Sequence, residues 1–240
     1  MLTSVLNKQL DQLFEEWESS NPQYLGKFTR DGIVNENQFQ EQKLKLLFIA
    51  KESNQTNVSP IEKQEDYRVE LNQVEMHKDY SKVYSYRIAE WAHGLLNDFP
   101  PFEELFSEAK FNRERYREIL QKIAFMNVKK TGGTGASNPE ELHKAIVQDH
   151  KFLMAEIKII DPDLIVLGLG LSKEMRSSLF PKLSESDWAD SGHAEIKVAR
   201  LDKMKIIDFY HPSVRPVTLT PAESYGLLQN VFRSQAFKEL

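Results

Sequence analysis

Four short apolar runs, each ending abruptly in polar residues, leave this sequence few possible folds. The runs cover residues 44–50, 123–128, 163–168 and 205–210, and segments with helical spacing lie between them. Short apolar runs without alternation are typical of strands buried on both faces, and strands that alternate with helices pair in parallel. The sequence therefore predicts an α/β fold with three α/β/α layers and a central four-stranded, mainly parallel sheet.

Helical spacing of apolar residues predicts the two outer layers. The clearest start is Ser137-Asn138-Pro139-Glu140-Glu141, which combines cap residues, a proline in the first turn and two acids beside it. Asp161-Pro162 ends that helix. The helices are expected over residues 2–19, 81–98, 113–121, 139–160 and 172–180.

A single domain accounts for residues 1–240, because no internal repeat or linker divides them. Residues 2–19 form its N-terminal helix, and the polar segment near 55–80 lacks a clear period and predicts a long surface loop or insertion. An edge strand is expected at 195–201. A loop carrying Trp188 and His193 precedes it.

The composition excludes several kinds of chemistry. The chain has no cysteine, so disulfides, cysteine-ligated zinc, iron–sulfur clusters and thiol nucleophiles are excluded. Its net charge of −5 gives no general attraction to nucleic acid, which would need a local basic groove. No apolar stretch approaches the roughly 18 residues of a membrane span. We expect a cytoplasmic protein with no membrane contact.

Polar residues follow three of the predicted strands. Glu52, Asn127 and His211 lie at or just beyond strand ends, and His211 is held by Pro212. Ligands of parallel sheets bind outside the carboxyl ends of the strands, so these three side chains are expected to line one crevice. The plain structural alternative is that His211 caps its loop and Glu52 pairs with Lys51 or Lys129.

Other motifs predict little. The loop 131–137 resembles a dinucleotide-binding turn, but Asn138 stands where the third glycine is needed, and the GK[ST] ending of a P-loop is absent. His143 and His150 are two helical turns apart, and His193 is more simply a solvated loop residue. We therefore expect neither a metal nor a nucleotide cofactor.

Four blocks together resemble the uracil-DNA glycosylase superfamily. They are Leu46-Leu47-Phe48-Ile49-Ala50-Lys51-Glu52, Phe125-Met126-Asn127-Val128-Lys129, the segment from Pro139 to Gly168, and Tyr210-His211-Pro212-Ser213-Val214-Arg215. The resemblance implies a pocket for an extruded base, and thus an enzyme that hydrolyses the N-glycosidic bond of a flipped or single-stranded damaged base such as uracil. DNA would be its partner, bound with modest affinity.

The resemblance also implies roles for individual residues. Glu52 falls where the family positions the attacking water, and His211 where a histidine bonds the base oxygen as charge develops on it. Substrate contacts are implied for Asn54, Asn127 and Ser213. Contacts to the DNA backbone are implied for Lys129, Lys130, Gly132, Gly133 and Arg215.

The chain departs from the family in its first motif. Ala50-Lys51-Glu52-Ser53-Asn54 lacks the family's glycine and proline, and the branches that carry an iron–sulfur cluster need cysteines that this chain does not have. Two alternatives therefore stay open. One is a non-catalytic nucleic-acid or nucleotide-binding protein of the same fold, and the other is an oxidoreductase that binds a nucleotide through Gly132–Gly135.

Overall fold

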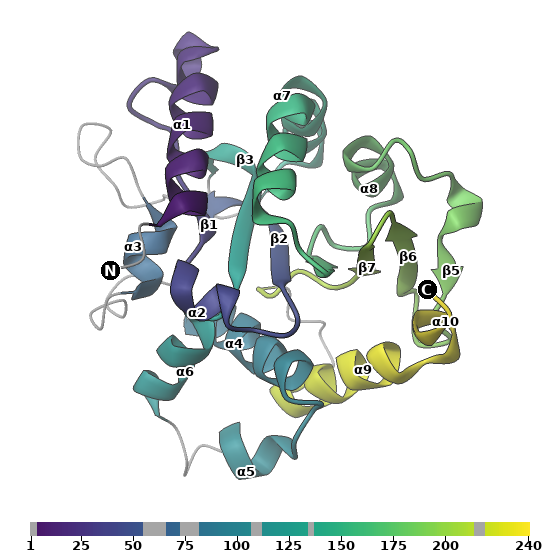
Figure 1. The fold of residues 1–240 in the computed structure, drawn as a ribbon. Helices are drawn as coiled ribbons and strands as arrows, with labels where there is room; N and C mark the ends of the chain where they lie inside the picture. The colour runs from purple at the N-terminus through teal and green to yellow at the C-terminus, as the bar shows by residue number, and fades with distance from the viewer. Residues whose placement is uncertain (1–3, 55–65, 73–81, 107–111, 134–136, 214–218) are drawn as a thin grey trace.

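A mixed seven-stranded sheet runs through the centre of the molecule (Figure 1). This computed structural model describes residues 4–54, 66–72, 82–106, 112–133, 137–213 and 219–240. The strands are β1 (Gly32–Ile33), β2 (Leu46–Asn54), β3 (Ala124–Gly133), β4 (Leu164–Leu167), β5 (Ala189–Asp190), β6 (Lys197–Leu201) and β7 (Met204–Asp208).

The sheet order is β1-β3-β2-β4-β7-β6-β5. The central strands β3, β2, β4 and β7 are mutually parallel, whereas β1, β6 and β5 pair antiparallel at the two edges. The predicted α/β class is confirmed. The predicted count of four strands is wrong for the sheet as a whole, because short antiparallel strands extend both of its edges.

Helices cover both faces of the sheet. They are α1 (Val5–Ser19), α2 (Glu36–Gln40), α3 (Tyr67–Asn72), α4 (Lys82–Leu96), α5 (Phe102–Phe106), α6 (Arg113–Leu120), α7 (Pro139–Ile160), α8 (Lys173–Leu179), α9 (Pro221–Arg233) and α10 (Gln235–Lys238). In Figure 1, α1, α7 and α8 lie above the sheet, and α4, α6 and α9 lie below it.

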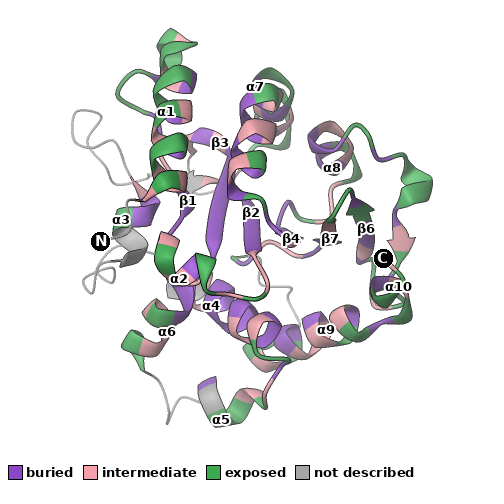
Figure 2. Cartoon of the chain, in the orientation of Figure 1, coloured by how far each residue is buried: buried purple, intermediate pink, exposed green. Residues whose placement is uncertain are grey.

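Alternating side chains of the central strands enter two separate cores. Leu47 and Ile49 of β2 pack with the α1, α7 and α8 layer, whereas Phe48 and Ala50 pack with the α4, α6 and α9 layer. Burial on both faces explains why the strand has no polar alternation. The buried colour of β2 and β3 in Figure 2 shows this central position.

The start of α7 confirms its sequence prediction. Asn138 caps the helix, since its side-chain oxygen accepts hydrogen bonds from the backbone N–H groups of Glu140 and Glu141, and Pro139 occupies the first turn. At the other end, Asp161 adopts a left-handed conformation with φ 52°. The cap is therefore Asn138 rather than its neighbour Ser137.

Two central strands are longer than predicted. β2 continues to Asn54 and β3 to Gly133, with Glu52 opposite Lys129 in the register. The polar residues predicted to follow these strands lie within them, because Glu52 of β2 pairs with Lys129 of β3 across the sheet. Most of the predicted 55–80 insertion lies outside the described residues, but Tyr67–Asn72 within it is a helix and not a loop.

None of the helices in the described part of the chain is both long and apolar enough to cross a membrane.

Candidate functional site

The candidate site lies at the edge of the sheet where the parallel strands end. Because β3, β2, β4 and β7 run in the same direction, their carboxyl ends share one edge. The chain passes from β2 to β3 on one side and later to β4 on the other, so the strand order reverses between β2 and β4. Such a reversal is where open α/β sheets leave a crevice for ligands.

His211 follows β7 at this edge and is held by its own turn. The backbone N–H of Ser213 donates to Nδ1 of His211 at 3.2 Å, and the Ser213 hydroxyl lies 2.7 Å from the same nitrogen. A backbone N–H can only donate, so Nδ1 is an acceptor and the proton of the neutral ring is on Nε2. The ring therefore has a hydrogen-bond donor free of its own turn.

His211 is neutral at physiological pH. Burial of the ring, with a smaller contribution from the positive charge of Lys51, lowers its pKa to about 4. A cation would be poorly solvated here, whereas neutral imidazole can still donate from Nε2. Gly168 permits the close packing of this segment, because a Cβ there would lie 3.2 Å from Cδ of Pro212.

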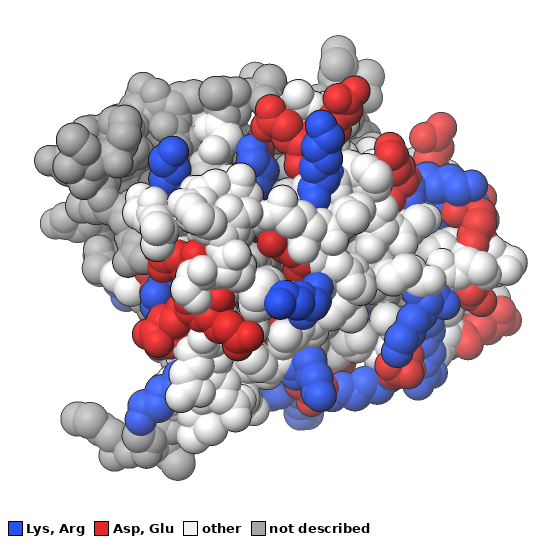
Figure 3. All heavy atoms as spheres, turned by 90° about the horizontal axis from the view of Figure 1, so that it is seen from above, with Lys and Arg blue, Asp and Glu red and all other residues white. Residues whose placement is uncertain are grey.

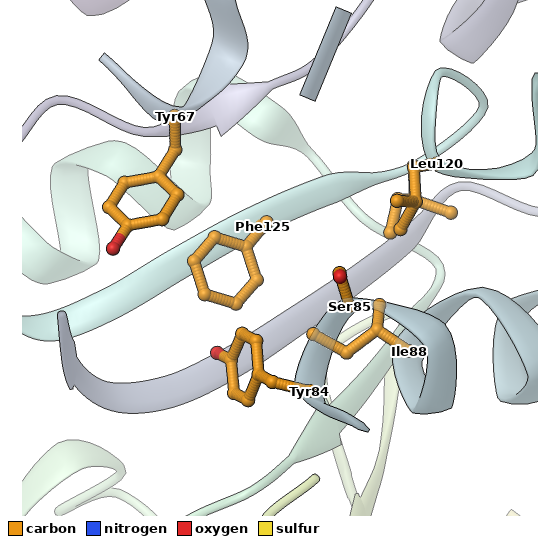
Figure 4. A pocket seen from close by; sticks show the side chains of 7 residues that line it. Tyr67, Tyr84, Ser85, Ile88, Leu120 and Phe125 are labelled. Carbon is orange, nitrogen blue, oxygen red and sulfur yellow. The ribbon is translucent and has the colours of Figure 1, made fainter. Parts of the chain in front are cut away.

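Aromatic rings form a wall between His211 and β3. The ring centre of Tyr84 lies 5.5 Å from that of His211 and 5.9 Å from that of Phe125. The ring centre of Tyr67 lies 5.9 Å from that of Phe125, on the other side of Phe125 (Figure 4). Burial, followed by the nearby Tyr67 and Asp31 groups, raises the pKa of Tyr84 well above its ordinary value. Tyr84 is therefore an uncharged phenol that lies between the turn after β7 and the first half of β3.

A small cavity lies behind this wall. Its volume is about 20 Å³, and it is lined by Tyr67, Tyr84, Ser85, Ile88, Leu120, Ile123 and Phe125. This volume suits about one water molecule and is far below the roughly 300–1,000 Å³ of ordinary ligand pockets. A ring-shaped ligand could enter only if an aromatic side chain of the wall moved.

Asn127 presents a buried carboxamide in the layer that contains this wall. It is 1% exposed, and its backbone N–H donates to Oδ2 of Asp31 at 2.7 Å. Its side chain faces the same layer as Phe125, two residues earlier on β3, and Ala50 is its neighbour on β2. Within the described ranges, neither its side-chain oxygen nor its nitrogen has a hydrogen-bonding partner.

An unpaired buried carboxamide is unusual in a folded protein. Each such donor or acceptor costs about 1–3 kcal/mol relative to one that is hydrogen-bonded. A ligand with a neighbouring donor and acceptor would satisfy both atoms of Asn127. This is the strongest sign of a binding site at the sheet edge.

Glu52 is engaged by a lysine. Its carboxylate is 5% exposed and accepts a hydrogen bond from Nζ of Lys129 at 2.6 Å, and Lys129 also lies 3.3 Å from Glu141. Gly133 packs against this carboxylate so closely that a Cβ would overlap it. The pairing of Glu52 with Lys129, one of the sequence alternatives, is therefore what the structure contains.

Lys130 cannot make the phosphate contact expected from the sequence. It is fully buried, and its Nζ pairs with Asp31 and lies 2.8 Å from Glu156. The rings of Phe14 and Trp17 lie 5.4 and 5.2 Å from the same atom. That prediction is wrong, because successive residues of β3 face opposite layers and Lys130 faces the α1 and α7 layer.

Lys51 is a residue that the sequence did not single out as functional. Its Nζ lies 3.4 Å from where a Cβ of Gly170 would be, so the side chain extends beside the turn that follows β4. Burial lowers the pKa of this ammonium, opposed by the neighbouring charge of Glu52. The only sequence signal was its position at the end of a buried strand.

The structure describes only some of the remaining predicted site residues. Ser213 is exposed and bonds to His211, and Gly132 and Gly133 belong to β3 rather than to a loop. The side chain of Asn54 and the whole of Arg215 lie outside the described residues. On the face seen in Figure 3, acidic and basic side chains are interspersed.

Among the residues that the structure describes, no three histidine, aspartate or glutamate side chains are grouped to hold a metal ion. No protein-family model, curated protein or solved structure matches this chain. Its function must therefore be argued from the side chains at the sheet edge.

Proposed function

We propose that this protein is a DNA glycosylase-like enzyme with a fold like that of the uracil-DNA glycosylases. It would hydrolyse the N-glycosidic bond of a damaged base, such as uracil, that is flipped out of a duplex or lies in a single strand. The unpaired carboxamide of Asn127 is the observation that carries this proposal. The edge of a nucleobase offers the neighbouring donor and acceptor that this group lacks.

The chemistry of base removal suits the neutral His211. Breaking the bond between C1′ and the base leaves negative charge on the base and positive charge on the sugar. The Nε2–H of His211 would donate to a base oxygen as that charge grows, and its low pKa keeps the ring neutral at pH 7. Donors placed where charge develops lower the barrier more than they strengthen substrate binding.

Glu52 would act on the sugar side of the bond. A carboxylate there stabilises positive charge and orients water, and its contact with Lys129 holds it in place. Tyr84 would have to move aside for the base, after which its ring could stack on it. Contacts to phosphate would come from Lys129 and Arg215.

The experiment is single-turnover excision of uracil and of hypoxanthine from single-stranded and duplex oligonucleotides. His211→Ala should lower the rate by about 10²–10³ while leaving DNA binding nearly unchanged. His193→Ala is the matched control, since its ring lies in the loop before β6. Release of neither base, or equal rates for H211A and the parent, would refute the proposal.

A binding protein without activity is the second candidate, and the engagement of Glu52 by Lys129 favours it. In that case DNA would bind and stay intact. Affinity should be modest and depend on salt, with a slope of about −0.7 to −0.9 in log K against log salt for each phosphate contacted. Tight binding that is insensitive to salt would argue against DNA as the partner.

A further inference from the structure

Lys51 is a half-buried amine at the same sheet edge as His211 and Asn127. It lies on β2 two residues beyond the last pair with β4, and its side chain extends toward the turn after β4, at the point where the strand order reverses. Lys51 and His211 both pack against the segment that follows β4, since a Cβ at Gly170 would lie 3.4 Å from Nζ of Lys51 and a Cβ at Gly168 would lie 3.7 Å from Cα of His211. The Glu52–Lys129 pair occupies the next position along β2.

The surroundings of Lys51 differ from those of the other lysines at this edge. Lys129 is paired with Glu52 and Lys130 with Asp31, whereas no carboxylate lies within ion-pairing distance of Lys51 in the described segments. Gly170, with φ 77°, lies beside its Nζ. Among these three lysines, Lys51 is the one whose head group is not engaged by an acid that the structure describes.

A half-buried amine without an acid partner is suited to nucleophilic attack. An ammonium must lose its proton before it can attack, and burial favours the neutral amine. Each unit by which the pKa falls raises the fraction of neutral amine about tenfold at a given pH. Glu52 opposes this shift but does not contact Nζ.

We propose that Lys51 forms an imine with the aldehyde of an abasic deoxyribose bound at this edge. The inference rests on the proposed function in one respect, since base removal would leave that sugar at the same edge of the sheet. In its ring-opened form the sugar carries an aldehyde at C1′. DNA that already contains an abasic site would be a substrate in its own right.

The step is balanced without any further reagent. The lone pair of the neutral Nζ attacks C1′, so that the N–C bond forms as the C=O π bond opens. A proton then passes from the nitrogen to the oxygen to give a carbinolamine. This intermediate then loses water, leaving a C=N bond between Lys51 and the sugar. Hydrolysis reverses the step, so the imine is transient unless it is reduced.

Borohydride trapping tests the proposal directly. The full chain is mixed with an oligonucleotide carrying one preformed abasic site, and borohydride delivers hydride to C1′, which converts the imine into a stable amine. The covalent product is digested and the modified residue is located by mass spectrometry. We expect the adduct on Lys51, and none with the same oligonucleotide lacking the abasic site.

Two variants sharpen the result. Lys51→Met keeps an unbranched side chain without the amine and should lower the trapped yield by at least about tenfold. Lys203→Met is the matched control, because Lys203 is an exposed lysine paired with Asp161 in the turn before β7, at the opposite edge of the sheet. K203M should trap as the parent does.

Several outcomes would overturn the proposal. One is an adduct on another lysine or on the terminal amine. A second is equal trapping by K51M and the parent. A third is unchanged trapping together with a smaller salt slope of DNA binding in K51M, which would make Lys51 a phosphate contact. If K51M does not fold, the adduct position in the parent protein still decides. Uracil excision measured on the same samples separates the two proposals, because trapping uses a preformed abasic site.

Discussion

Replacing Asn127 by leucine should make the protein more stable. The carboxamide is 1% exposed, and its donor and acceptor each lack a partner in the described structure. At about 1–3 kcal/mol for each unpaired group, the two together cost about 2–6 kcal/mol. Leucine has the same branch at Cγ and the same number of side-chain heavy atoms, and it removes both groups, while its bulkier methyl groups cost about 1–3 kcal/mol in a packed core. The expected net change is therefore a stabilisation of about 2 kcal/mol, within a range from about −1 to about 5 kcal/mol.

Urea denaturation of the two proteins measures this difference. Asn138→Ala serves as the control, because the Asn138 side chain is bonded at the start of α7 and its loss should destabilise the protein by about 1 kcal/mol. N127L should also lose base excision and the binding of free base. If N127L is instead less stable than the parent by more than about 1 kcal/mol, the carboxamide is hydrogen-bonded in solution, and the main reason for placing a ligand there is gone.

Two further predictions concern buried charges. Burial raises the pKa of Glu90 from 4.5 to about 7, despite Arg87 at 3.4 Å. Between these pH values the folded state holds a proton that the unfolded state releases, so the free energy of unfolding falls as the pH rises. In Glu90→Gln this fall in the free energy of unfolding should be smaller by about 3 kcal/mol across the same window. Urea denaturation at several pH values checks this, and parallel curves would contradict it. Lys130→Met should destabilise the protein by about 3–5 kcal/mol, because it leaves Asp31 buried without its cation. A loss below about 1 kcal/mol with a smaller salt slope of DNA binding would restore the phosphate contact first expected of Lys130.

Much of the central sheet could be predicted from apolar runs, and its edges could not. The runs at 163–168 and 205–210 correspond to β4 and β7, since strands buried on both faces carry a strong apolar signal. The two-residue strands β1 and β5 carry no such signal. The start of α9 was missed, although it was predictable. Thr220-Pro221-Ala222-Glu223 has the residues of a capping box, and the structure contains that capping box.

The site could be predicted only as far as strand ends. Position at the end of a parallel strand pointed to His211 and Asn127 without any knowledge of their contacts. The ion pairs of Lys130 could not be predicted, because its partners Asp31 and Glu156 are remote from it in sequence. Tyr84 lies in a helical pattern, and its contact with His211 depends on how α4 packs on the sheet.

The buried pair of Asp31 and Lys130 explains how Asn127 can remain unpaired. Oδ2 of Asp31 accepts the backbone N–H of Asn127, and the other oxygen binds Lys130 three residues further along β3. Both ends of this short piece of strand are thereby attached to one carboxylate, that of Asp31, which directly precedes β1 and is buried. The backbone at Asn127 is fixed by contacts that leave its carboxamide unused. A binding group held in this way loses little conformational entropy when a ligand arrives, so its orientation is set by folding and not by the ligand.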